Sequence, residues 1–82
     1  MLLDVVNFVF LDEYKILLTF ENGEKREFDC ATLIDQKPFH VFEDKNYFKR
    51  AKIEYGTLVW PNEIDIAPET LYVCSTPYEK VS

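Results

Sequence analysis

The sequence predicts an α+β fold: one small domain in which an antiparallel sheet of about four to five short strands packs with two or three short helices. Three observations lead to this prediction. The chain has 82 residues, the length of a single domain. Short segments rich in β-branched and aromatic residues alternate with turn formers. Two aspartates and one proline stand where short helices begin. We expect residues 1–78 to form the domain and residues 79–82 to be a C-terminal tail.

The first strand is expected in "LLDVVNFVF", near the N-terminus. Apolar side chains fall on both alternating faces of this segment. Because a strand with two apolar faces is usually buried on both, we expect a central strand or one covered on both sides.

A hairpin follows, with Asn22-Gly23 at its turn. A two-residue loop would place Phe28 opposite Leu17, whereas a three-residue loop with a left-handed Gly23 places it opposite Ile16. We favour the three-residue loop because it gathers the apolar side chains on one face.

The favoured register also places Glu24 and Arg26 on the apolar face of the hairpin. We expect these two residues to lie near the end of the sheet or to keep their charged groups in water.

Two short helical turns are expected in the middle of the chain. Asp29 and Asp44 are good N-cap residues for them. Pro38 prevents the first turn from continuing. Tyr47 and Phe48 should face inward from the second.

Two further strands are expected around Gly56, which with Thr57 suits a tight hairpin turn. Leu58 and Trp60 share one face of the second strand. Pro61 should end its pairing because it has no N–H to donate.

The last helix should begin at Pro68, where the missing N–H costs nothing. Leu71 and either Val73 or Cys74 should then pack on the sheet. Pro77 should end this segment.

Three blocks of this sequence resemble a bacterial family, the domain of unknown function 2442 (DUF2442). The matching residues are Thr19, Phe20, Asn22, Gly23, Arg26, Phe28 and Asp29; then Gly56, Thr57, Leu58, Trp60, Pro61 and Asn62; then Asp65, Ile66, Pro68, Glu69, Leu71 and Tyr72. One departure is Glu63 with Ile64, where members often carry a small residue, typically glycine, next to the asparagine. The resemblance implies a small α+β domain and no particular activity. Some relatives precede a helix-turn-helix, and others are encoded beside a small partner, an arrangement similar to toxin–antitoxin pairs.

Charge and composition limit the function. Fifteen acids against nine bases give a net charge of −6, which disfavours direct nucleic-acid binding and anionic membranes. The segment from Lys45 to Lys52 is locally basic, but the absence of a glycine-rich loop favours a solvated face there. No segment is apolar enough to span a membrane, and no signal peptide is evident. We therefore expect a cytoplasmic protein.

Catalytic and metal-binding patterns are missing from the sequence. Cys30 and Cys74 lack metal-ligand spacing; reduced thiols are the default expectation, and a disulfide between them remains an alternative. The single histidine, His40, stands among apolar residues, as a partly buried structural histidine does. We predict no catalytic residues, no metal and no cofactor, and a protein that is not an enzyme.

The candidate binding residues are Trp60, Asn62 and Asp65. One interpretation is structural: Trp60 belongs to the core, Asn62 forms an Asx-type turn, and Asp65 accepts N–H bonds near the last helix. The other is that the three line a shallow surface for a ligand or partner.

The charge of the chain and the lack of catalytic patterns favour a binding function. We expect an interaction module that binds another small protein, in an antitoxin-like or regulatory accessory role, because an acidic surface and an exposed strand edge suit such binding. The alternative is a small-ligand sensor of the type fused to helix-turn-helix regulators. A homodimer is also an option.

Overall fold

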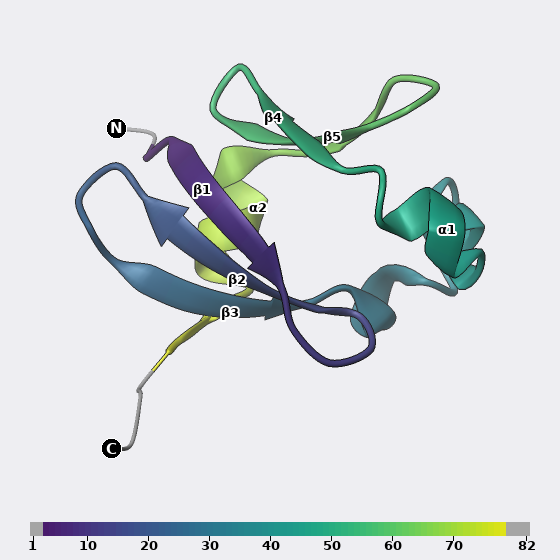
Figure 1. Cartoon of the computed structure of the whole chain (residues 1–82), viewed down its shortest axis with the longest axis horizontal. Helices are drawn as coiled ribbons and strands as arrows, with labels where there is room; N and C mark the ends of the chain where they lie inside the picture. The colour runs from purple at the N-terminus through teal and green to yellow at the C-terminus, as the bar shows by residue number, and fades with distance from the viewer. Residues whose placement is uncertain (1–2, 79–82) are drawn as a thin grey trace.

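The structure, a computed structural model, describes residues 3–78 and confirms the α+β class. Its strands form two antiparallel sheets, in the orders β1-β2-β3-β7 and β4-β5-β6, where one sheet was expected (Figure 1). The elements are β1 (Val5–Phe10), β2 (Lys15–Phe20), β3 (Lys25–Asp29), the 3₁₀ helices η1 (Cys30–Leu33) and η2 (Phe39–Glu43), α1 (Lys45–Phe48), β4 (Lys52–Glu54), β5 (Thr57–Trp60), β6 (Ile64–Ile66), α2 (Pro68–Val73) and β7 (Thr76–Pro77).

The β2–β3 hairpin has the predicted register. Ile16 pairs with Phe28, and the loop consists of residues 21–23. Gly23 has a φ of 87°, the left-handed conformation that a three-residue hairpin loop requires. Ile16, Leu18 and Phe28 are all buried, so the hydrophobic pattern did select the register.

The predicted turn between β4 and β5 is wrong by one residue. Tyr55 and Gly56 form it, with φ values of 55° and 75°. Thr57 instead belongs to β5, where its buried hydroxyl donates to the Ile66 carbonyl. Two consecutive left-handed residues match the right-handed twist of a hairpin. Gly56 suits this turn because a φ of 75° is strained for any residue with a side chain, and a Cβ there would also displace the exposed Asp4 carboxylate.

The predicted burial of the first strand is also wrong. β1 is an edge strand, and Val6 and Val9 are 56% and 48% exposed. The register of β1 shifts at a bulge between Val5 and Asn7. The apolar residues on both faces therefore do not indicate a central strand, because Val6 and Val9 are exposed to solvent.

The short helices begin where the sequence predicted. The Asp29 carboxylate accepts an N–H bond from Ala31 at 2.9 Å. The Asp44 carboxylate accepts from Asn46 at 3.0 Å and from Tyr47 at 3.3 Å. These side chains satisfy N–H groups that have no partner inside a helix. Pro68 is the first residue of α2, also as expected.

The core lies between the inner faces of the two sheets and is closed by η2, α1 and α2. Its buried members are Val5, Ile16, Leu18, Phe20, Phe28, Cys30, Phe42, Phe48, Leu58, Trp60, Ile66 and Leu71. The rings of Phe42 and Trp60 are 4.5 Å apart, and Phe48 lies 5.3 Å from Phe42. This aromatic cluster supplies much of the buried area of a short chain.

Helix α2 packs differently from the expectation at its second half. Leu71 is buried as predicted, but Val73 is 71% exposed and Cys74 is exposed. Tyr72 and the buried Ser75 turn toward the β2–β3 hairpin instead. The prediction failed because it considered only apolar side chains, whereas the contact here is largely polar.

Candidate functional site

Trp60, the first candidate residue, belongs to the core. It is 1% exposed, and its indole N–H donates to the Phe48 carbonyl at 2.7 Å. The hydroxyl of Tyr47 donates to the neighbouring Pro61 carbonyl, and burial raises the pKa of that phenol. Trp60 thus joins β5 to α1 and does not line a surface.

Asn62 and Asp65 are both exposed. Asn62 adopts a φ of 70° in the loop between β5 and β6, a conformation that asparagine tolerates. The expectation that Asp65 caps the last helix is wrong. Asp65 lies in β6 opposite Val59, and the N-cap of α2 is Ala67, which has no side-chain cap. The structure therefore does not bring the three candidates together at one surface.

Glu24 lies at the end of the β2–β3 hairpin, as expected, and its side chain is 34% exposed, whereas the side chain of Arg26 is only 12% exposed and does not reach into water. Arg26 donates to the Ser75 hydroxyl and carbonyl, both at 2.7 Å, and to Glu24 at 2.8 Å. The Tyr72 hydroxyl donates to the same carboxylate at 2.9 Å. Hydrogen bonding from Arg26 lowers the pKa of Glu24, and hydrogen bonding to Glu24 raises that of Tyr72. These bonds connect α2 and the residues that follow it to the β2–β3 hairpin.

The two cysteines and the single histidine differ in their exposure to solvent. Cys30 is buried, and burial together with the Asp29 charge raises its pKa to about 12. Its thiol therefore stays protonated at neutral pH. Cys74 and His40 are exposed, which corrects the expected partial burial of the histidine, and both thiols are free. No set of three metal-binding side chains comes together within residues 3–78.

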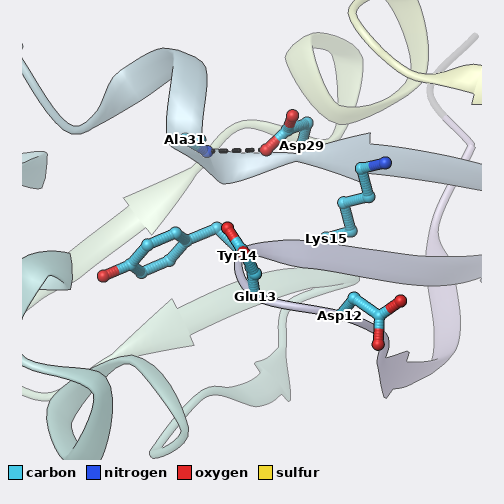
Figure 2. Close-up of a pocket in the computed structure, with 6 residues that line it drawn as sticks. All are labelled: Asp12, Glu13, Tyr14, Lys15, Asp29 and Ala31. Atoms are coloured by element: carbon cyan, nitrogen blue, oxygen red, sulfur yellow. Dashed lines mark hydrogen bonds between the residues drawn. The ribbon is translucent and has the colours of Figure 1, made fainter.

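Two shallow hollows lie around the turn that follows β1. The first, of about 330 Å³, is lined by Asp12, Glu13, Tyr14, Lys15, Asp29 and Ala31 (Figure 2). The second, of about 260 Å³, is lined by Leu11, Asp12, Lys15, Glu27 and Tyr78. Ligand pockets are usually apolar with a few polar groups, at ~300–1,000 Å³. The first hollow is at the lower end of that range and the second is below it, and both are lined mainly by charged residues instead of apolar ones.

The outer side of β1 offers unpaired backbone groups. Leu11 N–H donates to the Lys15 carbonyl across the β1–β2 ladder, so the backbone of Val9 also turns toward β2. Phe8 and Phe10 consequently turn their N–H and C=O groups away from β2. Within residues 3–78, no other backbone group bonds to them on that side. We call this row of groups the β1 edge.

The other edges of the two sheets are protected. β7 has two residues, one of which is Pro77. β4 has three, including Lys52 and Glu54, which pair at 2.8 Å. β6 has three, with Asp65 at its centre. β1, by contrast, has six residues with neither a charge nor a proline. Short length, charge and proline are the usual protection of an edge, and β1 carries only a bulge.

An exposed strand edge was expected, but not at β1, because the position of a strand within a sheet is not a local property of the sequence. The signal that could have revealed it is "VVNFVF", the longest uncharged strand among the described residues. That pattern suits a buried strand and an unprotected edge equally well.

The comparisons with known proteins identify a family but no activity. Searches of curated proteins and of solved structures found no match. No helix in the described part of the chain has the length and apolar character to cross a membrane. A family model described as "Protein of unknown function (DUF2442)" matches residues 5–76, nearly the whole chain. The chain therefore belongs to the DUF2442 family.

Proposed function

We propose that this protein is an interaction module without enzymatic activity that binds another small protein by taking an extended segment of it onto the β1 edge. Its role would be antitoxin-like or that of a regulatory accessory protein, in which it neutralises or positions the partner. We place it in the cytoplasm, because an exposed free thiol such as Cys74 persists in a reducing compartment.

The observation that carries the proposal is the contrast between β1 and the other sheet edges. An unpaired row of N–H and C=O groups is a template for another strand. Recognition by strand addition uses such a row for affinity and the neighbouring side chains for specificity. The exposed Val6 and Val9 would provide apolar contacts beside the added strand.

The small-molecule alternative has less support. The hollows around Asp12 and Lys15 are shallow and mainly charged, whereas a sensor needs an enclosed apolar pocket. We therefore propose no ligand for them.

The experiment uses a matched pair of variants at Phe8. Tagged protein is isolated from its native host, and the captured partner is identified and quantified. Phe8→Ala and Phe8→Pro both lose the ring, which packs against Phe10 at 5.4 Å. Only Phe8→Pro also loses the outward N–H, and proline is tolerated on an edge strand when its nitrogen faces solvent. We expect Phe8→Ala to retain the partner and Phe8→Pro to lose it.

Circular dichroism of both variants verifies that each is folded. If folded Phe8→Pro retains as much partner as Phe8→Ala does, strand addition on β1 is contradicted. Recovery of the wild-type protein alone, with no stoichiometric partner, would contradict the proposed function as a whole.

A further inference from the structure

We propose that the segment taken by the β1 edge is a short run of apolar, β-branched residues flanked at both ends by lysine or arginine, and that it belongs to a different protein rather than to a second copy of this chain. This inference rests on the proposed function and specifies the chemistry of the partner.

Acidic side chains stand at both ends of an uncharged strand. Asp4 precedes β1, and Asp12 and Glu13 follow it after one residue; all three are exposed. None of them takes part in an ion pair within residues 3–78. An extended segment alongside β1 would therefore meet negative charge at each end and none in the middle. Lysine or arginine at both ends of the segment complements this pattern.

The same charges oppose pairing of β1 with itself. When two copies pair antiparallel about Phe8, the Asp4 end of each strand lies at the same end of the pair as Asp12 and Glu13 of the other chain. Like charges facing each other across two strands are destabilising. The repulsion occurs twice in a symmetric dimer, and each chain also carries a net charge of −6. A basic partner meets neither obstacle.

The length of the partner's apolar run follows from the length of β1 that is open to pairing. The Val5 N–H is occupied by the Gly56 carbonyl at 2.8 Å, so pairing can begin only beyond Val5. The strand ends at Phe10. The open stretch is thus residues 6–10, and at ~3.4 Å per residue it spans roughly 17 Å.

Tyr55 lies at the closed end of this stretch. Its neighbour Gly56 is the residue bonded to Val5, and its side chain is 94% exposed. Its φ of 55° is a conformation that asparagine and glycine adopt more readily than an aromatic residue. A large ring that is exposed to water, at a backbone position that disfavours it, is suited to contact a partner. The geometry assigns Tyr55 as the aromatic contact at that end of the segment.

The probe is a labelled synthetic peptide with five alternating valine and threonine residues between two pairs of lysines. A matched peptide carries glutamates in place of the lysines. Binding to the full chain is measured by fluorescence anisotropy at low and at high salt. We expect the lysine peptide to bind and the glutamate peptide not to bind, and we expect salt to weaken the binding.

The protein variants test the two ends separately. Asp4→Asn and the double variant Asp12→Asn, Glu13→Gln should each raise the Kd about two- to five-fold, the range that exposed ion pairs contribute. The control is Glu43→Gln with Glu69→Gln, which removes two exposed acids outside β1 and its flanks and should leave the Kd unchanged. Tyr55→Asn should weaken binding because it removes the aromatic ring. It should also raise the melting temperature, because asparagine adopts the left-handed conformation of this turn with less strain.

The outcomes separate this inference from the proposed function. If the glutamate peptide binds as well as the lysine peptide and Phe8→Pro abolishes both, the charge assignment is wrong and strand addition stands. If the control variant weakens binding as much as Asp4→Asn, the effect is general and the assignment of the flanks fails. If neither peptide binds, or if folded Phe8→Pro binds like Phe8→Ala, strand addition on β1 is itself overturned.

Discussion

The guanidinium group of Arg26 lies over the ring of Tyr72, 4.3 Å from its centre. The two residues come from β3 and α2, and Ser75 and Glu24 complete the arrangement with hydrogen bonds to the same guanidinium. The side chain of Arg26 is only 12% exposed. This stack connects the last helix to the first sheet, and it accounts for an arginine on the inner face of a hairpin.

We expect Arg26→Lys to lower the free energy of unfolding by about 1–3 kcal/mol. Lysine keeps the charge but cannot donate to Ser75 and Glu24 in one plane while it stacks on Tyr72. Urea denaturation followed by fluorescence measures the change. Lys25→Ala, at an exposed neighbouring position, is the control and should change stability by less than about 0.5 kcal/mol. An equally small effect of Arg26→Lys would show that the stack contributes little.

The raised pKa of the Cys30 thiol should make the protein less stable at alkaline pH. Its pKa is raised from 9.0 to about 12 in the folded protein, so the unfolded chain releases the thiol proton first. The contribution of the protonated Cys30 thiol to the free energy of unfolding is therefore fully present below pH 9 and is lost as the pH rises toward 12. Denaturation at a series of pH values should show Cys30→Ala losing less stability than wild type above pH 9, by up to about 1.4 kcal/mol per pH unit.

The control for this titration is Cys74→Ala, because Cys74 is exposed. Its stability should follow the wild-type pH profile. Tyrosines that ionise in the same range affect all three proteins alike. If Cys30→Ala and wild type decline in parallel, the buried thiol is not the cause.

Glu63→Gly should stabilise the protein by about 0.5–1 kcal/mol. Glu63 has a φ of 61°, and a left-handed conformation costs a residue with a side chain about 1–2 kcal/mol. Glycine removes this cost but loses part of the gain through its greater freedom in the unfolded chain. Thermal denaturation measures the difference. Glu43→Gly, in η2 and without a positive φ, should instead destabilise, and a similar loss for Glu63→Gly would refute the argument.

Asn62, in the loop before β6, and Asp65, in β6 itself, should respond differently to alanine. Asn62→Ala should cost about 1 kcal/mol because alanine is strained at a φ of 70°, and Asn62→Gly should recover most of that loss. Asp65→Ala should change stability by less than about 0.5 kcal/mol, since Asp65 is exposed and caps no helix. Chemical denaturation of the three variants checks this. A large loss in Asp65→Ala would restore the capping role that the sequence suggested.

Local features of this chain could be predicted well. The loop at Asn22-Gly23, the caps Asp29 and Asp44, and the start of α2 at Pro68 all appear where expected. Each depends on the conformational preferences of a few adjacent residues, so a short window of sequence contains the required information. The turn at Tyr55 was missed because tyrosine is unusual in a left-handed position.

The candidate site could not be predicted in the same way. The α+β class, the hairpin register and the helix starts follow from the sequence, because they depend on local backbone preferences and on hydrophobic alternation. The edge position of β1, the burial of Trp60 and the contact of Arg26 with a serine 49 residues away follow only from the folded arrangement. Those outcomes depend on which segments meet across the core, and segments distant in sequence carry no local record of that contact.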